Sequence, residues 1–337
     1  MQIKDWGEER WVQHLKELFP VKGHMTGIGD DCAVIPYEEN RAWLVTTDAL
    51  VEGVHFLKEQ ISALDLGYKT IAVNVSDIAA MGGSPAYAFL SIAFPKNTEC
   101  QWAFELIQGM KDACKNWNIQ LLGGDTVGSK RDVFMSLTLV GSTVLTHLKY
   151  RHTAKSNDVI CVTGYLGNSG AGLQALQENI PKTKEIDYLI HSHFHPEPHL
   201  QEGIWLASHN GVHAMMDLSD GLDCDLKRLI KSSGTGAAIE TSKIPLSPKL
   251  LQASLDYQWN ALKFALTGGE DYCLLLTVSS KAFPEIQSSF HKKFGSVLHE
   301  IGKITDQTGQ LKYQQNGILI QLDYINFDHF QMEDFPI

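Results

Sequence analysis

The chain has 337 residues, 44% of them hydrophobic, and a formal net charge of −11 from 39 acidic and 28 basic side chains. This length suffices for two domains with sizeable cores. The negative charge argues against bulk binding of nucleic acid, which requires a basic surface. No apolar run approaches the length of a membrane span, so we expect no membrane partner.

Cysteine usage and the N-terminus bear on the compartment. Six cysteines are scattered without a C-x-x-C pair, which argues against a zinc site or a disulfide framework. The first residues, Met1 to Trp6, lack the apolar centre of a signal peptide. We therefore expect a cytoplasmic protein.

The first part of the chain alternates apolar runs with acidic stretches. Residues 8–19 have helical spacing, and residues 42–48 read as a buried strand that ends in an acid. Residues 63–81 predict a helix that is apolar nearly all round and therefore buried, on which Asn74 and Asp77 share a face. Four further elements are predicted: a strand over 86–94, a helix over 99–117, a strand over 119–122 and a strand over 133–145.

The polar run from Lys149 to Asp158 predicts a domain boundary near residue 150, which gives domains 1–150 and 151–337. After it, strand 159–163 leads into the glycine-rich run 164–172 and a helix. Further elements are predicted in this order: 213–216 entering an acidic motif, a helix over 222–230, and strands over 272–278, 298–304 and 318–322. Strands and helices mix throughout, so the fold class is α/β or α+β.

Five acidic stretches carry the candidate chemistry. Each lies in or beside an apolar segment, where a lone carboxylate is costly unless a cation offsets it. Their carboxylates, hydroxyls and amides offer oxygen, which suits Mg²⁺ or Ca²⁺. Each Asp taken alone is better explained as a helix cap or a turn residue, but the set together favours a metal and phosphate site. The stretches contain Asp30 and Asp31, Thr46-Thr47-Asp48, Asn74 to Asp77, Gly123 to Thr126, and Asp217 to Asp220.

Other candidates allow two interpretations each. The glycine-rich run 164–172 fits either backbone contacts to phosphate or a tight strand–helix turn, because it matches neither a P-loop nor G-x-G-x-x-G. Arg151 fits a phosphate contact or a solvated linker, and His55 a ligand contact or a structural role. The histidines of residues 191–199 are interrupted by prolines and lack HExxH spacing, so we do not expect a metal there. No nucleophile–base arrangement is visible.

The motifs occur in an order that resembles the bacterial thiamine-monophosphate kinase family. They are Gly-Ile-Gly-Asp-Asp at 27–31, Thr-Thr-Asp at 46–48, Asn-Val-Ser-Asp-Ile-Ala-Ala-Met-Gly at 74–82, Gly-Gly-Asp-Thr at 123–126, Asp-Leu-Ser-Asp-Gly-Leu at 217–222 and Gly-Gly-Glu-Asp-Tyr at 268–272. The resemblance implies ATP-dependent phosphorylation of thiamine monophosphate to thiamine diphosphate. It also implies the two-domain aminoimidazole-ribonucleotide-synthetase-like fold, with N-terminal sheets pairing in a homodimer and a C-terminal α/β domain.

The resemblance also implies roles for single residues. Several Mg²⁺ ions would be bound by Asp31, Thr46, Thr47, Asp48, Asp77, Asp125, Asp217 and Asp220, with Asp30 adjacent. ATP would contact Gly124, Asp125, Arg151 and Ser219, and the thiamine substrate would contact His55, Glu270 and Phe327. Three positions depart from the family, which often has Tyr at Phe327 and Arg at His195 and His199.

The chemistry fits this resemblance. The nucleophile would be a phosphate-monoester oxygen with a second pKa of about 6, so direct in-line transfer needs no side-chain base. His55 is the rival candidate for a base. Alternatives are another ATP-using enzyme of the superfamily, such as a cyclo-ligase or a selenophosphate synthetase, and a non-catalytic nucleotide- or cation-binding protein. A selenophosphate synthetase is expected to carry a reactive Cys near the N-terminus, whereas Cys32 lies inside the metal motif.

Overall fold

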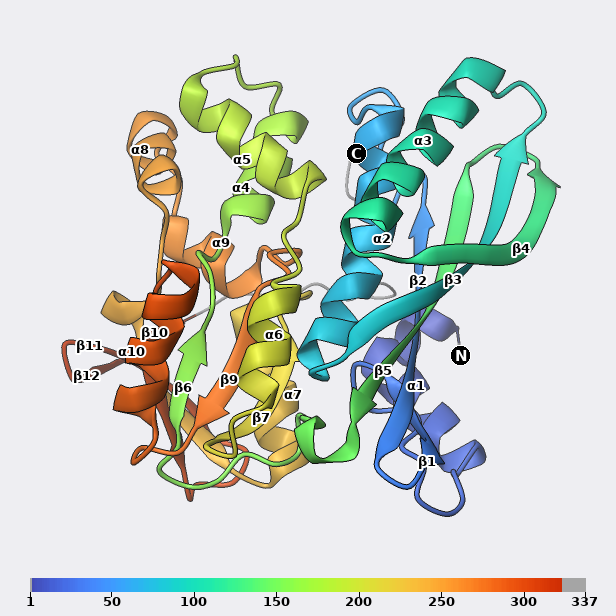
Figure 1. Cartoon of the computed structure of the whole chain (residues 1–337). Coiled ribbons are helices and arrows are strands. Elements are labelled where there is room, and N and C mark those ends of the chain that lie inside the picture. Colours follow the sequence, from blue (N-terminus) through green and yellow to red (C-terminus); the bar gives the residue numbers. More distant parts are fainter. Residues whose placement is uncertain (1, 323–337) are drawn as a thin grey trace. The chain divides into compact units, whose positions relative to one another are not determined.

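A computed structural model describes residues 2–322 (Figure 1). The chain divides into two compact units. Among the described residues, unit 1 comprises 2–78 and 83–145, and unit 2 comprises 79–82 and 146–322.

Unit 1 is built on a five-stranded sheet in the order β1-β2-β5-β3-β4. Neighbouring strands are antiparallel except β3 and β4, which run parallel because α3 connects them. Its elements are α1 (Glu8–Leu18), β1 (Ala33–Glu38), β2 (Arg41–Val51), α2 (Ala63–Ala80), β3 (Ser84–Pro95), α3 (Cys100–Asn116), β4 (Gln120–Ser129) and β5 (Phe134–Val144), with a short 3-10 turn at Ile3–Asp5.

Within the part of the chain that the structure describes, strands β2, β5 and β3 of this sheet are covered on one face only, and β4 is exposed along nearly its whole length. On β3, Leu90 and Ile92 are buried, whereas the alternate residues Tyr87 and Phe89 are 37% and 42% exposed. Successive side chains of a strand point to opposite faces, so this alternation separates a covered from an uncovered face. Helix α2 lies on the covered face, where Ile78 approaches Gly141 of β5 (Figure 1).

Helices α2 and α3 pack closely through paired glycines. A Cβ added to Gly67 would lie 2.2 Å from the carbonyl oxygen of Leu106, and one added to Gly109 would lie 2.1 Å from that of Leu64. Only glycine fits such an approach of two backbones. The packing buries α2, as its all-round apolar sequence predicts, and Ile71 and Val75 are both 0% exposed.

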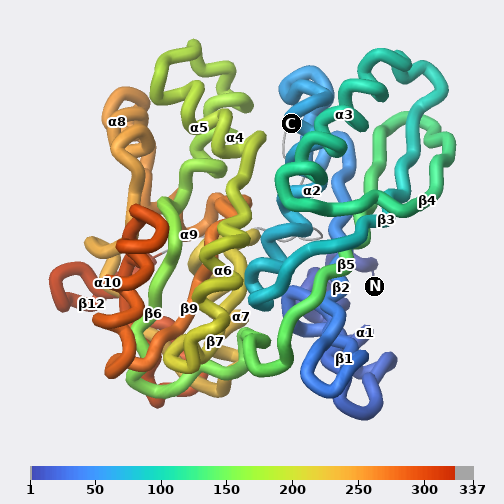
Figure 2. The backbone as a smooth tube through the Cα atoms, viewed as in Figure 1, coloured from blue at the N-terminus to red at the C-terminus, as the bar shows by residue number. Residues whose placement is uncertain are grey.

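Unit 2 contains a seven-stranded sheet in the order β12-β11-β8-β10-β6-β9-β7. Strand β9 lies between β6 and β7, although it follows both far along the chain (Figure 2). Its elements are β6 (Val159–Val162), α4 (Asn168–Gln177), α5 (Lys184–Phe194), α6 (Leu200–Ala207), β7 (Val212–Asp217), α7 (Leu222–Ser233), β8 (Gly236–Glu240), α8 (Pro248–Tyr257), α9 (Ala261–Thr267), β9 (Leu274–Val278), α10 (Phe283–Phe294), β10 (His299–Thr305), β11 (Leu311–Gln315) and β12 (Ile318–Ile320), with 3-10 turns at Leu145–His147 and Thr241–Lys243.

The central strands of this sheet are buried on both faces. Every residue of β6 and β9 is buried, as expected for strands with helices on either side. One core contains Leu226 and Leu229 of α7 with Leu266 of α9. Trp205 of α6 packs edge-on against Phe290 of α10, with ring centroids 5.9 Å apart.

The mixed α/β class predicted from the sequence is therefore confirmed. Several elements extend beyond their predicted ends, such as β2 to Val51 and α7 to Ser233, and β4 differs most. The strand expected over 119–122 extends to Ser129, through the Gly-Gly-Asp-Thr motif, because β3 continues to pair with it as far as Pro95. Within the described residues, no helix is long and apolar enough to cross a membrane.

Candidate active site

In unit 1, two predicted site carboxylates come together on the covered face of the sheet. The hydroxyl of Thr46 on β2 donates to the carboxylate of Asp77 on α2. Carboxylate oxygens of Asp31 and Asp77 lie within 4.8 Å of one another. Like charges this close repel each other, so a bound cation would lower the free energy of the pair.

Asp48 is fixed by the same helix. Its backbone N–H donates to Oδ1 of Asn74 over 3.2 Å, and the Asn74 amide donates to the carbonyl of Thr70 over 3.1 Å. Asn74 and Asp77 therefore both face β2, as their i, i+3 spacing predicts. The donors gathered here are all oxygens, so the residues present fit Mg²⁺. Asp30 lies beside them in sequence, and its Oδ1 accepts the N–H of Asp31 over 3.2 Å.

Thr47 and Asp125 lie on the uncovered face instead. Thr47 stands between Thr46 and Asp48 in β2, and its hydroxyl lies 3.3 Å from the hydroxyls of both Ser136 and Thr138 on β5. Asp125 of β4 pairs in register with Ser91, an exposed residue of β3. Two strands separate β4 from β2, which is a span of about 14 Å. Unit 1 therefore does not bring Asp125 next to Asp77.

Gly124 precedes Asp125 at a point where β4 approaches β3 very closely. Its φ is +150°, and an added Cβ would lie 1.7 Å from the carbonyl oxygen of Leu90. No other residue fits this position without moving a strand. The glycine therefore fixes where the following carboxylate stands on the sheet.

His55 lies in the turn after β2. The backbone N–H of Val51 donates to its Nδ1 over 3.1 Å. Because Nδ1 accepts a hydrogen, the neutral ring carries its own hydrogen on Nε2. His55 can therefore donate to a phosphate oxygen through Nε2, and in this tautomer it has no nitrogen left to act as a base.

In unit 2, Asp217 ends β7 and Asp220 precedes α7. Arg228 of α7 donates to the carboxylates of Asp220 and, over 3.0 Å, of Asp225. Burial raises the pKa of Asp225 to about 7, and the charge of Asp220 acts in the same direction, whereas Arg228 lowers it. The neighbouring Cys224 is a thiol, because burial raises its pKa to about 12. An arginine thus already offsets the charge of Asp220, and the group around it fits Mg²⁺ less well than the oxygens of unit 1.

The loop before β9 is hydrogen-bonded to the backbone of the Asp217–Asp220 motif. The backbone N–H of Glu270 donates to the carbonyl of Ser219 over 2.7 Å, and that of Tyr272 donates to the carbonyl of Leu218 over 2.9 Å. Glu270 and Tyr272 have φ values of +55° and +49°, in the left-handed region that non-glycine residues rarely adopt. Such strain is concentrated at functional sites, because the surrounding structure must hold it in place.

The glycine-rich run forms a tight turn onto α4. The carboxylate of Asp271 accepts the backbone N–H of Gly167 over 2.7 Å and that of Ser169 over 3.4 Å. Burial raises the pKa of Asp271 to about 7, while these N–H groups lower it. Of the two interpretations of this run, the strand–helix turn is therefore the observed one, since an internal carboxylate takes the place of a phosphate.

Arg151, another predicted residue, borders the group around Asp225 and the end of α7. The carbonyl of Arg151 accepts the hydroxyls of Ser232 and Ser233 over 3.2 and 2.9 Å, and the charge of Arg151 lowers the pKa of Asp225. Phe327 lies outside the described residues. Among the histidines, the rings of His191 and His195 stack with centroids 4.7 Å apart.

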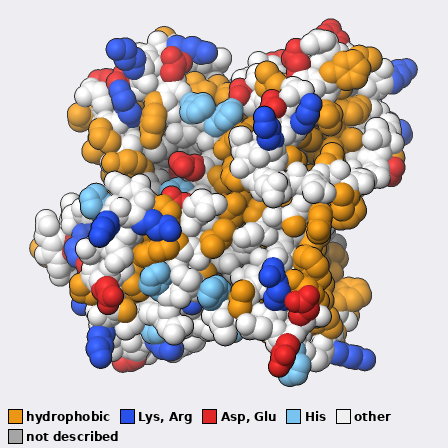
Figure 3. All heavy atoms as spheres, viewed as in Figure 1, with side chains coloured by type: hydrophobic (Ala, Val, Ile, Leu, Met, Phe, Trp, Pro, Cys, Tyr) orange, Lys and Arg blue, Asp and Glu red, His pale blue; other side chains and the backbone are white. Residues whose placement is uncertain are grey.

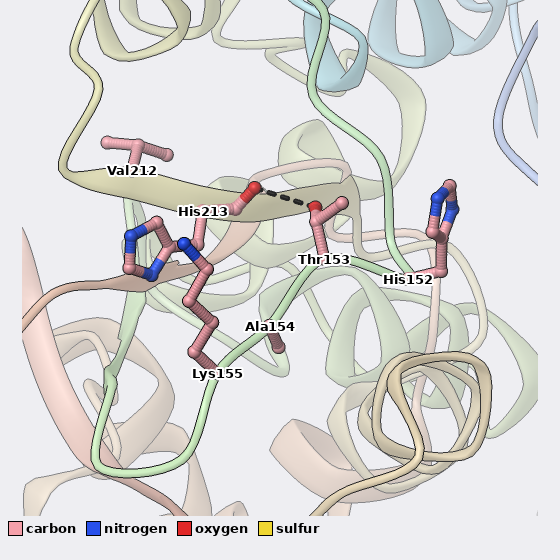
Figure 4. Close-up of a pocket in the computed structure, with 6 residues that line it drawn as sticks. All are labelled: His152, Thr153, Ala154, Lys155, Val212 and His213. Atoms are coloured by element: carbon pink, nitrogen blue, oxygen red, sulfur yellow. Dashed lines mark hydrogen bonds between the residues drawn. The ribbon is translucent and has the colours of Figure 1, made fainter.

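A separate hollow of about 330 Å³ lies at the start of β7, and none of the predicted residues lines it. In Figure 4 the ammonium of Lys155 lies beside the ring of His213, whose Nδ1 is 2.9 Å from both carboxylate oxygens of Asp158. The hydroxyl of Thr153 donates to the carbonyl of His213 over 2.7 Å. The hollow is lined by His152, Thr153, Ala154, Lys155, Val212 and His213.

Comparison with known proteins identifies the family. The AIR synthase related protein N-terminal domain matches residues 29–143, and the C-terminal domain of the same family matches residues 155–314. A thiamine-monophosphate kinase of Buchnera aphidicola subsp. Schizaphis graminum is 37% identical, over 92% of this chain and 94% of its own length. The chain belongs to the thiamine-monophosphate kinase family. The Bacillus subtilis thiamine-monophosphate kinase is 34% identical, over 90% of this chain and 93% of its own length.

Solved structures agree with this family. The structure of AaThiL complexed with AMPPCP and TMP has a TM-score of 0.85 and 31% identity, covering 98% of this chain and 99% of that one. The Escherichia coli hydrogenase maturation protein HypE, at 17% identity and a TM-score of 0.67, shares the fold alone. The predicted thiamine-monophosphate kinase family and its two-domain fold are therefore confirmed.

Three residues that the sequence analysis did not single out belong to the network around the thiamine-monophosphate kinase motifs. They are Arg228, Asp271 and His193, whose Nδ1 lies 3.2 Å from Oε2 of Glu270. Asp271 is the second acid of the motif Gly-Gly-Glu-Asp-Tyr, so the sequence did contain a signal for it. For Arg228 the local signal was Asp225, three residues earlier on the same helix, whereas its other partner, Asp220, lies before the helix begins.

Proposed function

We propose that this protein transfers the γ-phosphoryl group of ATP to thiamine monophosphate, giving thiamine diphosphate and ADP. The observation that carries the proposal is the match, over 98% of the chain, to a structure complexed with AMPPCP and TMP. The curated relatives at 34–40% identity carry the same activity in their names. The test is direct: purified protein with ATP and thiamine monophosphate should form thiamine diphosphate, and absence of product would overturn the proposal.

The proposed metal is Mg²⁺. Its proposed ligands in unit 1 are Asp30, Asp31, Thr46, Thr47, Asp48, Asp77 and Asp125, and in unit 2 they are Asp217 and Asp220. The strongest support is the all-oxygen group around Asp31 and Asp77. Bound Mg²⁺ supplies positive charge that offsets the repulsion between two phosphorylated substrates.

The proposed nucleotide contacts are Gly124, Asp125, Arg151 and Ser219, and the proposed substrate contacts are His55, Glu270 and Phe327. A carboxylate such as Glu270 suits thiamine, which has a positively charged thiazolium ring. The Nε2–H of His55 suits a phosphate oxygen, since Nδ1 is engaged by Val51. We keep residues 1–150 and 151–337 as the proposed domains.

Transfer is proposed to be direct and in line, without a side-chain base. The substrate phosphate is mostly deprotonated at neutral pH, so no proton must be removed first. The tautomer of His55 supports this, because Nε2 carries a hydrogen. With ATP made chiral at the γ-phosphorus, the configuration should invert, whereas retention would indicate a phosphoenzyme.

We also propose a cytoplasmic homodimer joined through the sheets of unit 1. The support is the uncovered face, where Ile35 and Phe89 are 40% and 42% exposed and the rings of Trp43 and Tyr87 lie 6.4 Å apart. Hydrophobic side chains also gather over β3 and β4 in Figure 3. An exposed apolar face of this kind marks an interaction surface. For the compartment, the support is that none of the six cysteines forms a disulfide.

A further inference from the structure

One histidine of the 191–199 tract points into the protein beside a proposed substrate contact. His193, on α5, is 5% exposed. Its Nδ1 lies 3.0 Å from the hydroxyl of Ser169 on α4 and 3.2 Å from Oε2 of Glu270. The three residues come from separate elements of unit 2 and meet at a single nitrogen.

The partners of this nitrogen determine where its hydrogen lies. A carboxylate oxygen only accepts hydrogen bonds, so an Nδ1 that faces one must carry a hydrogen to avoid repulsion between two lone pairs. A buried imidazole without a partner would also cost free energy. His193 therefore acts as a donor toward the carboxylate, and the hydroxyl of Ser169 shares the same nitrogen.

The backbone around Glu270 separates two adjacent acids. Asp271 turns to the N-terminus of α4, where it accepts the N–H groups of Gly167 and Ser169. Glu270 instead contacts His193, whose Nδ1 also meets the hydroxyl of Ser169, and its side chain is 25% exposed. The carboxylate of Glu270 is thus held at Oε2 and remains partly open to solvent.

We propose that His193 is a positioning residue for substrate binding, which holds the Glu270 carboxylate oriented toward the positively charged part of thiamine. This inference rests on the proposed function, because it takes Glu270 as a substrate contact. Without the donor, the carboxylate would lose the hydrogen bond at Oε2, and its affinity for a cation would fall. ATP carries no such cation, so its binding does not depend on this contact.

The test compares the steady-state KM and kcat of three single variants, one double variant and one control variant with those of the wild-type enzyme. His193→Leu removes the donor and fills the buried position with an apolar side chain. His193→Asn places an amide N–H near the position of Nδ1. Glu270→Gln removes the charge that His193 is proposed to hold. His191→Leu, at an exposed position on the same helix, is the matched control.

We expect His193→Leu to raise KM for thiamine monophosphate by about tenfold or more, as for loss of a hydrogen bond to a charged group. KM for ATP and kcat should change less than twofold. His193→Asn should recover most of the affinity, because the donor is restored. Adding His193→Leu to Glu270→Gln should cause little further loss, since both changes remove the same interaction.

Each other outcome has a defined meaning. Equal KM increases in the Leu and Asn variants would overturn the proposal, because packing and not the donor would then matter. If Glu270→Gln raises KM but His193→Leu does not, the positioning role fails while the substrate contact stands. If Glu270→Gln has no effect, there is no substrate contact to position. A wild-type enzyme without thiamine diphosphate product would instead overturn the proposed function itself.

A measurement independent of turnover completes the test. Nitrogen-15 NMR of labelled histidine reports which ring nitrogen of His193 carries the hydrogen. We expect the Nδ1–H form in the wild-type protein and a change of that signal in Glu270→Gln. A neutral ring with its hydrogen on Nε2 alone would contradict the donor role.

Discussion

The carboxylate of Asp271 gives a prediction about stability and pH. Burial raises its pKa from the ordinary 3.8 to about 7, in spite of the N–H groups of Gly167 and Ser169 that lower it. The folded state therefore binds a proton that the unfolded state has already released. Below about pH 4 both states are protonated, and stability from this group falls as pH rises from about 4 to 7.

The magnitude follows from the two pKa values. The difference between 3.8 and about 7 corresponds to at most about 4 kcal/mol of unfolding free energy. In Asp271→Asn this contribution is absent, whereas the amide oxygen can still accept the N–H of Gly167. The stability of Asp271→Asn relative to the wild type should therefore increase by up to about 4 kcal/mol between pH 4 and 7.

Urea unfolding in the presence of chelator, followed by circular dichroism at several pH values, measures this difference. The matched control is Asp256→Asn, which makes the same chemical change at an exposed residue of α8. A difference for Asp271→Asn that is constant with pH, or that favours the variant toward low pH, would refute the reasoning. The N–H groups at the start of α4 would then dominate over burial.

Four further predictions concern the proposed site and dimer. Gly124→Ala should lower Tm by roughly 5–10 °C, because the added Cβ would meet the carbonyl oxygen of Leu90. Gly128→Ala, in the same strand, places its Cβ in open space and should change Tm little. Equal Tm values for the two variants would contradict the close approach of β4 to β3. Asp77→Asn should reduce kcat at least about a hundredfold in steady-state assays with the fold intact by circular dichroism, and near-normal kcat would remove Asp77 from the site. Calorimetric titration of ATP in chelator should show little binding, and equal affinity with and without Mg²⁺ would exclude a metal-dependent nucleotide site. Phe89→Lys should yield monomers in sedimentation velocity while Phe104→Lys, on the exposed side of α3, should not; dimers in both would place the interface elsewhere.

The spacing of apolar residues predicted the helices and strands that are buried in the structure. The residues of 63–81 are apolar nearly all round, which favours a buried helix, and the i, i+3 spacing puts Asn74 and Asp77 on one side of it. The strand through Thr46-Thr47-Asp48, which continues to Val51, was predicted for a similar reason. In such segments the local pattern and the packing agree, and the sequence is enough.

Long-range pairing explains what the pattern did not show. Gly123 and Gly124 are typical of a loop, yet they continue β4 because β3 pairs with it beyond them. From the sequence, the N–H groups of the run 164–172 were candidates for binding phosphate. In the structure the carboxylate of Asp271, which is far away in the sequence, accepts the N–H of Gly167. Likewise His193 gave only a compositional signal, since its partners lie on other elements. Contacts of this kind depend on the tertiary structure and leave no periodic trace.

The two units balance their acidic charge in different ways, and this has a consequence for local unfolding. In unit 2, Arg228 is a permanent internal counter-charge for Asp220 and Asp225. In unit 1, the close carboxylates of Asp31 and Asp77 gain most from a cation taken up from solution. Ligand linkage then predicts that the amide hydrogens of α2 gain protection against exchange when Mg²⁺ is added, because opening that helix would release the ion. The amides of α7 should gain less protection, because Arg228 already offsets the charge of the proposed ligand Asp220.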